Sequence, residues 1–236
     1  MAYFQFEDMT RLLYTLIPVG AAVLGAAVAA YRRPNPILVS AIQHFAAGVV
    51  FAAAAGEILP DLKHGGSLWA IAIGGAAGVM FMLGLKRLEE RAGSALGLIA
   101  LVGIDILIDG LVLGLGFVAG AKVGLLLTIA LSVELLFLSL TVASEISAGE
   151  RSPVQIILMT GGLALLLPVG AQLALPISLL SAPVVAGFFT FGLIALLYLV
   201  TEELLVEAHK IPDRPWVTAM FFVGFLILLI LEEAIG

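Results

Sequence analysis

Long apolar runs alternate with short polar segments along the whole chain. Eight of these runs approach or exceed the roughly 20 residues that an α-helix needs to cross a hydrocarbon core about 30 Å thick. They occupy residues 10–31, 37–60, 68–86, 95–119, 122–147, 154–176, 183–206 and 215–234. The short segments between them carry most of the charges. The pattern predicts one all-α transmembrane domain over residues 1–236, with eight helices and almost nothing folded outside the bilayer.

Composition supports a membrane location and excludes other classes of protein. Hydrophobic residues make up 62% of the chain and charged residues only 12%, as in multi-pass membrane proteins. No basic stripe is present to follow a phosphate backbone, so no nucleic acid partner is expected. The absence of cysteine excludes disulfides and thiolate metal sites. The first apolar run is long enough to stay in the bilayer and follows several charges, so no cleaved signal peptide is predicted.

Lysine and arginine are unevenly distributed between the two sets of loops. The loops after odd-numbered spans hold Arg32, Arg33, Lys86, Arg87, Arg91, Arg151, Lys210 and Arg214. The opposite side holds Arg11, Lys63 and Lys122. Because the excess of these residues marks the cytoplasmic side, we predict a multi-pass protein of the cell (inner) membrane with both termini outside.

Three acidic residues interrupt the apolar runs at one depth. Asp105 and Asp109 lie in the fourth span and Glu134 in the fifth, and a rise of about 1.5 Å per residue puts all three near the middle of the membrane. The spacing of four places the two aspartates on one helix face. A charge at that depth costs about 3 kcal/mol, and no Lys, Arg or His lies in the middle of a span to neutralise it. A single such acid can be a protonated structural residue, but three together favour binding of an external cation.

The segments that carry these acids resemble the ZIP family of divalent-metal transporters. In "DILIDG", Asp105, Asp109 and Gly110 fall at the His, Glu and Gly positions of the family's His-Asn-x-Pro-Glu-Gly-like motif. In "ELLFLS", Glu134 takes the His position of the second motif and Leu138 its Glu position. The stretches "FAAGVVFAAAAGEILPDL" and "LLYLVTEELLVEAH" are similar to ZIP segments of the second and seventh spans. The resemblance implies a ZIP-like bundle that transports a divalent metal ion.

The motifs are depleted relative to those of the family. In the first motif, Ile106 and Ile108 stand at the Asn and Pro positions. In the second, Leu135, Phe137 and Leu138 stand at the Asn, Pro and Glu positions. A two-metal centre of the family type is therefore not expected. Without the prolines, the sequence also gives no reason to expect the broken helices of the family.

A single metal site of Asp105, Asp109 and Glu134 remains, with Ser132 or Ser139 and water as accessory ligands. Carboxylate oxygens are hard ligands, so an all-oxygen site favours Mn²⁺, Mg²⁺, Ca²⁺ or Fe²⁺ more than a histidine-containing site would. Zn²⁺ also accepts carboxylates, and Cd²⁺ stays a candidate beside it. The metal is expected as a substrate, and no cofactor is predicted.

A short internal repeat supports a transporter architecture. "GEILPD" ends the second span and "EELLVE" ends the seventh, with similar acids over residues 57–61 and 203–207. By the loop charges these two ends face opposite sides of the membrane. An inverted repeat of helices 1–3 onto helices 6–8, around helices 4 and 5, has this property and places the substrate site between the halves.

Polar residues near the span ends predict a route for the ion. On the outside these are Glu57, Asp61 and His64, and on the inside Gln43, His44, Glu202, Glu203, Glu207 and His209. A histidine at a helix end is often only interfacial, so for His44 and His209 both metal contact and simple packing stay open. The expected direction is uptake toward the cytoplasm.

The same residues also bear on other functions. An intramembrane aspartyl protease needs acids on two helices, which Glu134 and an aspartate would supply, but no Gly-Leu-Gly-Asp-like signature is present. Serine and zinc proteases need a deep histidine, which the spans lack. A transport-deficient homologue that acts as a metal sensor or partner subunit fits the depleted motifs. We expect a transporter that is not an enzyme. Its expected partners are a divalent cation and the lipid bilayer, and the sequence is also compatible with a homodimer.

Overall fold

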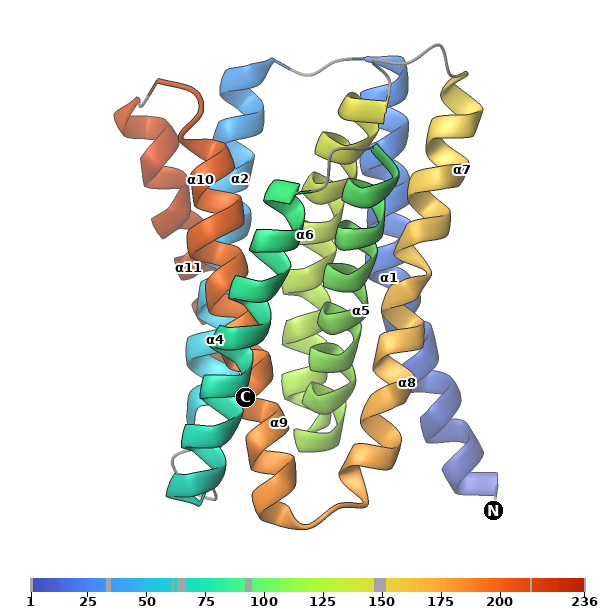
Figure 1. Cartoon of the computed structure of the whole chain (residues 1–236), viewed down its shortest axis with the longest axis vertical. Helices are drawn as coiled ribbons and strands as arrows, with labels where there is room; N and C mark the ends of the chain where they lie inside the picture. The colour runs from blue at the N-terminus through green and yellow to red at the C-terminus, as the bar shows by residue number, and fades with distance from the viewer. Residues whose placement is uncertain are drawn as a thin grey trace.

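In the part of the chain that the computed structural model describes, eight apolar helices run side by side (Figure 1), and each is long enough to cross a membrane. The structure describes residues 2–32, 35–60, 62, 67–91, 95–146, 152–212 and 214–235. Asp61 and His64, predicted for the outer route, lie outside the described residues. The all-α membrane fold predicted from the hydrophobic pattern is confirmed.

The eight spans correspond to the predicted runs within about five residues, except that the first helix begins at Ala2, eight residues before the predicted run. The first four are α1 (Ala2–Tyr31), α2 (Pro36–Ala53) with the π-helix η1 (Ala54–Ile58), α4 (Leu68–Arg91) and α5 (Ala95–Ala119). The last four are α6 (Ala121–Ile146), α7 (Pro153–Ala164) with α8 (Leu166–Ser178), α9 (Ala182–Tyr198) with the π-helix η2 (Leu199–Leu204) and α10 (Leu205–Ala208), and α11 (Pro215–Ile235). As the missing prolines led us to expect, α5 and α6 are continuous.

The sixth span is broken between α7 and α8. The backbone N–H of Leu165 bonds to the carbonyl of Gly162 at 3.3 Å, one residue closer than in an α-helix. Pro168 has no N–H to offer the carbonyl of Ala164, so the regular ladder cannot continue through this point. The apolar run alone did not predict this break.

The helices pack in two groups of four. One group contains α1, α5, α6 and the α7–α8 pair, with α1 against α6 and α5 against α8. The other contains α2, α4, α9 and α11, with α2 against α11 and α4 against α9. The inverted repeat relates span one to six, two to seven, three to eight and four to five. Under this exchange the contact of α1 with α6 becomes that of α8 with α5, and the contact of α2 with α11 becomes that of α9 with α4. The π-helices η1 and η2 also occupy the matching acidic ends of the second and seventh spans. The packing therefore has the symmetry that the inverted repeat predicts.

Glycines let the paired helices touch through their backbones. A Cβ atom on Gly110 of α5 would fall on the carbonyl oxygen of Leu167 in α8, and one on Gly170 of α8 would fall on the carbonyl of Leu107. Equivalent contacts in the other pairs use Gly25, Gly48, Gly74 and Gly224. Small residues serve this purpose in membrane bundles because close packing replaces the hydrophobic driving force. The contact at Gly110 also fixes the position of the adjacent Asp109.

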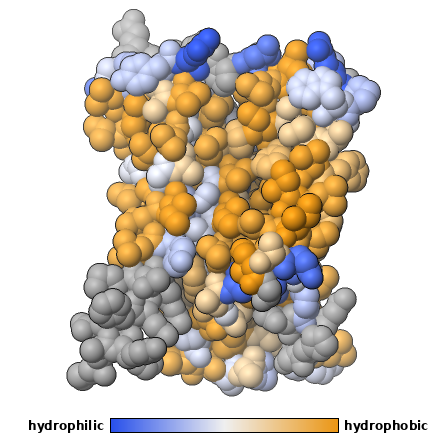
Figure 2. Space-filling model, turned by 180° about the vertical axis from the view of Figure 1, so that it is seen from behind, coloured by the Kyte–Doolittle hydropathy of each residue, from blue (hydrophilic) through white to orange (hydrophobic). Residues whose placement is uncertain are grey.

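The outer surface of the bundle suits a lipid environment. Helices α4 and α11 are the least enclosed, with 11% of their central residues buried, and they expose large side chains such as Trp69, Ile73, Phe222 and Ile230. Figure 2 shows hydrophobic side chains over the middle of one face and hydrophilic ones along its upper rim. The chain is thus a multi-pass membrane protein.

The glycine contacts can be tested by matched substitutions in the sixth span. Gly170→Ala should lower stability by about 1–3 kcal/mol, because the added methyl must push α8 away from α5. Gly162→Ala should be neutral or stabilising by up to about 1 kcal/mol, since nothing lies within 4 Å of its Cβ position and alanine is the better helix former. Thermal unfolding in detergent measures both, and equal effects would contradict the backbone contact.

Candidate metal centre

Asp105 and Asp109 on α5 and Glu134 on α6 form one cluster inside the bundle. One carboxylate oxygen from each lies within 4.8 Å of the others. The side chains are 6%, 2% and 1% exposed, respectively. One turn separates the aspartates, and the packing of α6 on α5 brings Glu134 to the same level. The structure thus brings together the three acids that the sequence grouped by depth.

The carboxylates of this cluster have few partners of their own. Oδ2 of Asp109 and both side-chain oxygens of Glu134 are buried and accept no hydrogen bond from the described residues. None of the three acids forms an ion pair with a described Lys, Arg or His. A protonated acid with a purely structural role would be expected to bond to a neighbouring helix, because a buried polar group without a partner is costly.

The spacing of the oxygens suits a metal ion. Two oxygens bound to one divalent cation at about 2.0–2.6 Å lie at most roughly 5 Å apart. The separations of up to 4.8 Å in the cluster fall within this limit. A divalent cation would supply both the missing partners and the missing positive charge, with water filling the remaining positions. The donor set therefore fits a hard divalent ion.

A cavity of about 470 Å³ leads to the cluster from one end of the bundle. Asp105 and Glu134 line it, while Asp109 lies behind them. Its other polar lining residues are Gln43, Lys86, Glu89, Thr141, Tyr198, Glu202, Glu203, Glu207 and Lys210. Several of these lie near the loops rich in Lys and Arg, so the cavity opens toward the side that those loops predict to be cytoplasmic. The predicted inner residues Gln43, Glu202, Glu203 and Glu207 all belong to it.

Negative charge dominates the cavity. Among the described residues, six carboxyl groups and two ammonium groups line it. Lys86 pairs with Glu202 at 2.7 Å, and Lys210 pairs with Glu207. The side chains of Lys86 and Glu202 are 36% and 46% exposed, so this pair stabilises the fold by at most about 1 kcal/mol. The excess of carboxylates raises the local concentration of cations in front of the cluster.

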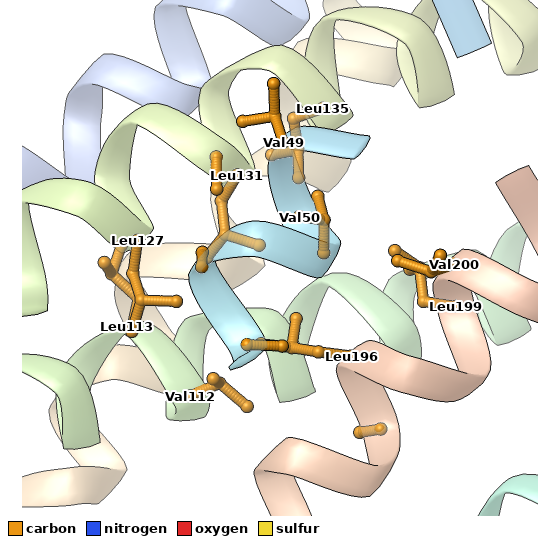
Figure 3. Packing of buried hydrophobic residues seen from close by; sticks show 14 of the residues in the cluster. Val49, Val50, Val112, Leu113, Leu127, Leu131, Leu135, Leu196, Leu199 and Val200 are labelled. Carbon is orange, nitrogen blue, oxygen red and sulfur yellow. The ribbon is translucent and has the colours of Figure 1, made fainter. Parts of the chain in front are cut away.

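Hydrophobic side chains fill the space on the other side of the acids. The fully buried ones labelled in Figure 3 include Val50, Leu113, Leu127, Leu131 and Leu196, from α2, α5, α6 and α9. Leu113 follows Asp109 by four residues on α5. Leu131 precedes Glu134 by three residues on α6. This hydrophobic block therefore begins within about one turn of the acids, on the side away from the cavity.

The remaining predicted residues lie elsewhere. Glu57 is 7% exposed and sits in η1, at the end of the second span opposite to Gln43. Fourteen residues separate them, which is roughly 20 Å along a helix. His44 and His209 contact each other, with ring centroids 4.9 Å apart, and neither lines the cavity. Glu57 stays a prediction for the outer route.

The two serines are on α6 with Glu134 but are not aligned with it. Ser132 donates its hydroxyl to the carbonyl of Thr128 at 2.6 Å, and Ser139 is 3% exposed. At about 100° per residue, positions two before and five after Glu134 point to other sides of the helix. Their role as accessory ligands stays a prediction.

Sequence reasoning did not assign Lys86, Glu89 or Tyr198 to the route. The position of Lys86 beside a loop indicates only a charge that sets orientation, yet its ammonium group pairs with Glu202 and lies 5.8 Å from the centre of the Tyr198 ring. The spacing of three between Lys86 and Glu89 on α4 was an available signal for a shared face. The pairing of Lys86 with Glu202 on η2 could not be predicted from the sequence, because the two residues are 116 positions apart.

Comparisons with known proteins give no further assignment. No protein-family model matches the chain, and no curated protein matches it. The eight apolar helices and the buried acidic cluster are compatible with a membrane transporter.

Metal binding at the cluster should appear as a change in stability. Without metal, the double variant Asp109→Asn with Glu134→Gln should be at least as stable as the native chain, because it removes buried unpaired acids. With Mn²⁺ at 100 times its Kd, the native chain should gain about 2.7 kcal/mol and the variant should gain none. Melting in detergent measures this, with the exposed Glu90→Gln as control. Equal stabilisation of both proteins by Mn²⁺ would place the ion elsewhere.

Proposed function

We propose that this protein transports divalent metal cations across a membrane through the Asp105–Asp109–Glu134 cluster. The observation that carries the proposal is the difference between the two sides of the cluster among the described residues. A cavity lined by acids reaches the cluster on one side, and the buried side chains of Leu113, Leu127 and Leu131, labelled in Figure 3, pack on the other. A substrate site near the middle of the membrane that is open to one side is what an alternating-access transporter requires.

The direction of transport is proposed from the charge of the loops. The cavity opens toward the loops that carry most of the Lys and Arg, which are expected in the cytoplasm. Uptake would then bring the ion through the hydrophobic block and release it along Glu203, Glu202 and Glu207. The termini, on this proposal, are outside.

The two helix groups offer a physical basis for alternation. Within each group the helices touch through glycine backbone contacts, which resist deformation. The acids belong to the group of α5 and α6, whereas the hydrophobic block and the cavity lie between the two groups. A displacement of one group against the other would separate the leucines and valines of the block and close the cavity, without disturbing the glycine contacts.

Membership of the ZIP family is part of the same proposal. It is supported by the resemblance of "DILIDG" and "ELLFLS" to the family motifs and by the convergence of their acids on neighbouring helices. The loss of motif residues also fits a homologue that binds metal without transporting it. Flux measurements separate these two functions.

Transport can be tested in proteoliposomes with a trapped metal indicator. The native chain should move Mn²⁺ or Zn²⁺, and Asp105→Asn with Asp109→Asn should reduce the rate to that of empty liposomes, because the ligands are lost. Glu90→Gln, at the exposed end of α4, should retain the native rate. Flux through the aspartate variant would remove the central claim. Metal binding without flux in the native chain would favour the sensor or partner-subunit function.

Ligand chemistry should set the choice of ion. Asp105→His with Glu134→His restores imidazole at the two family positions and should raise the ratio of Zn²⁺ to Mn²⁺ flux, because nitrogen donors favour zinc more than manganese. Asp105→Glu with Glu134→Asp keeps oxygen donors and should leave the ratio near its native value. An unchanged ratio in the histidine variant would show that ligand softness does not determine selectivity here.

A further inference from the structure

Lys86 places a positive charge among the carboxylates of the cavity. Its Nζ donates to Oε2 of Glu202 at 2.7 Å, and both side chains line the cavity. Glu89 follows Lys86 by three residues on α4, and Glu203 directly follows Glu202. Both of these acids also line the cavity, and neither forms an ion pair with a described residue. The ammonium group thus lies where an ion leaving the cluster would meet further carboxylates.

The packing of α4 against α9 keeps the lysine beside its acid. The two helices run side by side (Figure 1), and a Cβ atom on Gly74 of α4 would fall on the carbonyl oxygen of Gly187 in α9. Both helices belong to the same group of four. A displacement of one group against the other therefore leaves Lys86 next to Glu202.

Tyr198 offers the ammonium group a second position. The centre of its ring lies 5.8 Å from Nζ of Lys86, within the range of a cation–π interaction. Its Oη is buried and makes no hydrogen bond with the described residues, although a phenol oxygen can accept one. Because the four-carbon stem of lysine is flexible, Lys86 can leave Glu202 and still keep an attractive partner.

The matching position at the other end of the inverted repeat carries an acid instead of a lysine. The shift along the sequence that aligns "GEILPD" with "EELLVE" relates Gly56 to Glu202. The same shift relates Glu232 of α11 to Lys86 of α4. The structure supports this correspondence, because a Cβ atom on Gly56 would lie 2.8 Å from Oε2 of Glu232. The same two positions therefore meet at both ends, but only the end with the cavity has a lysine in this place.

We propose that Lys86 is a tethered competitor of the transported ion and keeps the cavity carboxylates from retaining it. In the empty cavity the ammonium group is bound to Glu202. A divalent ion leaving the cluster displaces the ammonium group toward Tyr198, and the return of the ammonium group to Glu202 expels the ion. Attachment to the cavity wall gives the lysine a high effective concentration. Lys86 thus speeds release of the ion, a role that rests on the transport function proposed above.

Mn²⁺ binding to a chain without the cluster tests the competition. Asp105→Asn with Asp109→Asn removes ligands of the cluster and leaves the acids of the cavity, and the EPR signal of free Mn²⁺ measures binding in detergent. In this background, Lys86→Met should tighten Mn²⁺ binding about three- to fivefold, the factor that corresponds to the strength of one exposed ion pair. Adding Glu202→Gln should abolish this gain, because the carboxylate for which the two cations compete is then absent.

Two substitutions on α4 serve as controls in the same background. Arg87→Met removes an equal charge at the adjacent exposed position, which does not line the cavity, and should leave Mn²⁺ affinity unchanged. Lys86→Arg keeps the charge and should also leave it near the background value. No gain from Lys86→Met, an equal gain from Arg87→Met, or a gain that survives Glu202→Gln would overturn the competition.

With the cluster intact, release can be followed as flux into proteoliposomes. Lys86→Met should lower both the half-saturating Mn²⁺ concentration and the maximal rate, and Lys86→Arg should restore both. A lysine that only supports the fold would lower the rate without tightening binding, and an unchanged or faster maximal rate in Lys86→Met would overturn the role in release. A native chain without flux would contradict the transport function, whereas the binding comparison decides the competition by itself, so the two failures are separable.

Discussion

The burial of three carboxyl groups within 4.8 Å of one another is the constraint on which the rest of the structure depends. Each oxygen taken from water needs a compensating partner, yet several oxygens of Asp109 and Glu134 find none among the described residues. No described Lys, Arg or His forms an ion pair with these acids to replace the lost hydration. A visiting cation or a set of retained protons must do so, and the acidic cavity supplies a path for the cation.

Packing inside the bundle keeps this unfavourable arrangement in place. Backbone contacts at Gly110 and Gly170 hold α5 against α8, and the contact of Gly25 holds α1 against α6. The acids therefore sit on a rigid group of helices. The side of the cavity is shared with the second group, where π-helix η2 turns Glu202 and Glu203 toward the opening. Such π-helices occur frequently at functional sites because they redirect side chains within a helix.

The number and limits of the helices could be predicted from the sequence because membrane insertion is decided locally. Each span must be apolar over its own length and must satisfy its own backbone hydrogen bonds, so runs such as 95–119 and 215–234 can be located without knowing their neighbours. The depth of Asp105, Asp109 and Glu134 follows from the same local count. The break in the sixth span, where the N–H of Leu165 bonds to Gly162, depends by contrast on Pro168 alone. The run stays apolar there, so its hydrophobic pattern does not predict the break.

The sequence alone determined the membrane fold, the shared helix face of the two aspartates and the level of Glu134. Only the tertiary structure decided that α6 presents Glu134 to that face, that Lys86 meets Glu202, and that His44 meets His209. It also decided that a cavity reaches the acids on one side and that, among the described residues, hydrophobic side chains pack on the other. The physical reason is that helical periodicity fixes directions within one helix, whereas contacts between helices depend on their rotation and neighbours, which glycine packing sets over long distances in the chain.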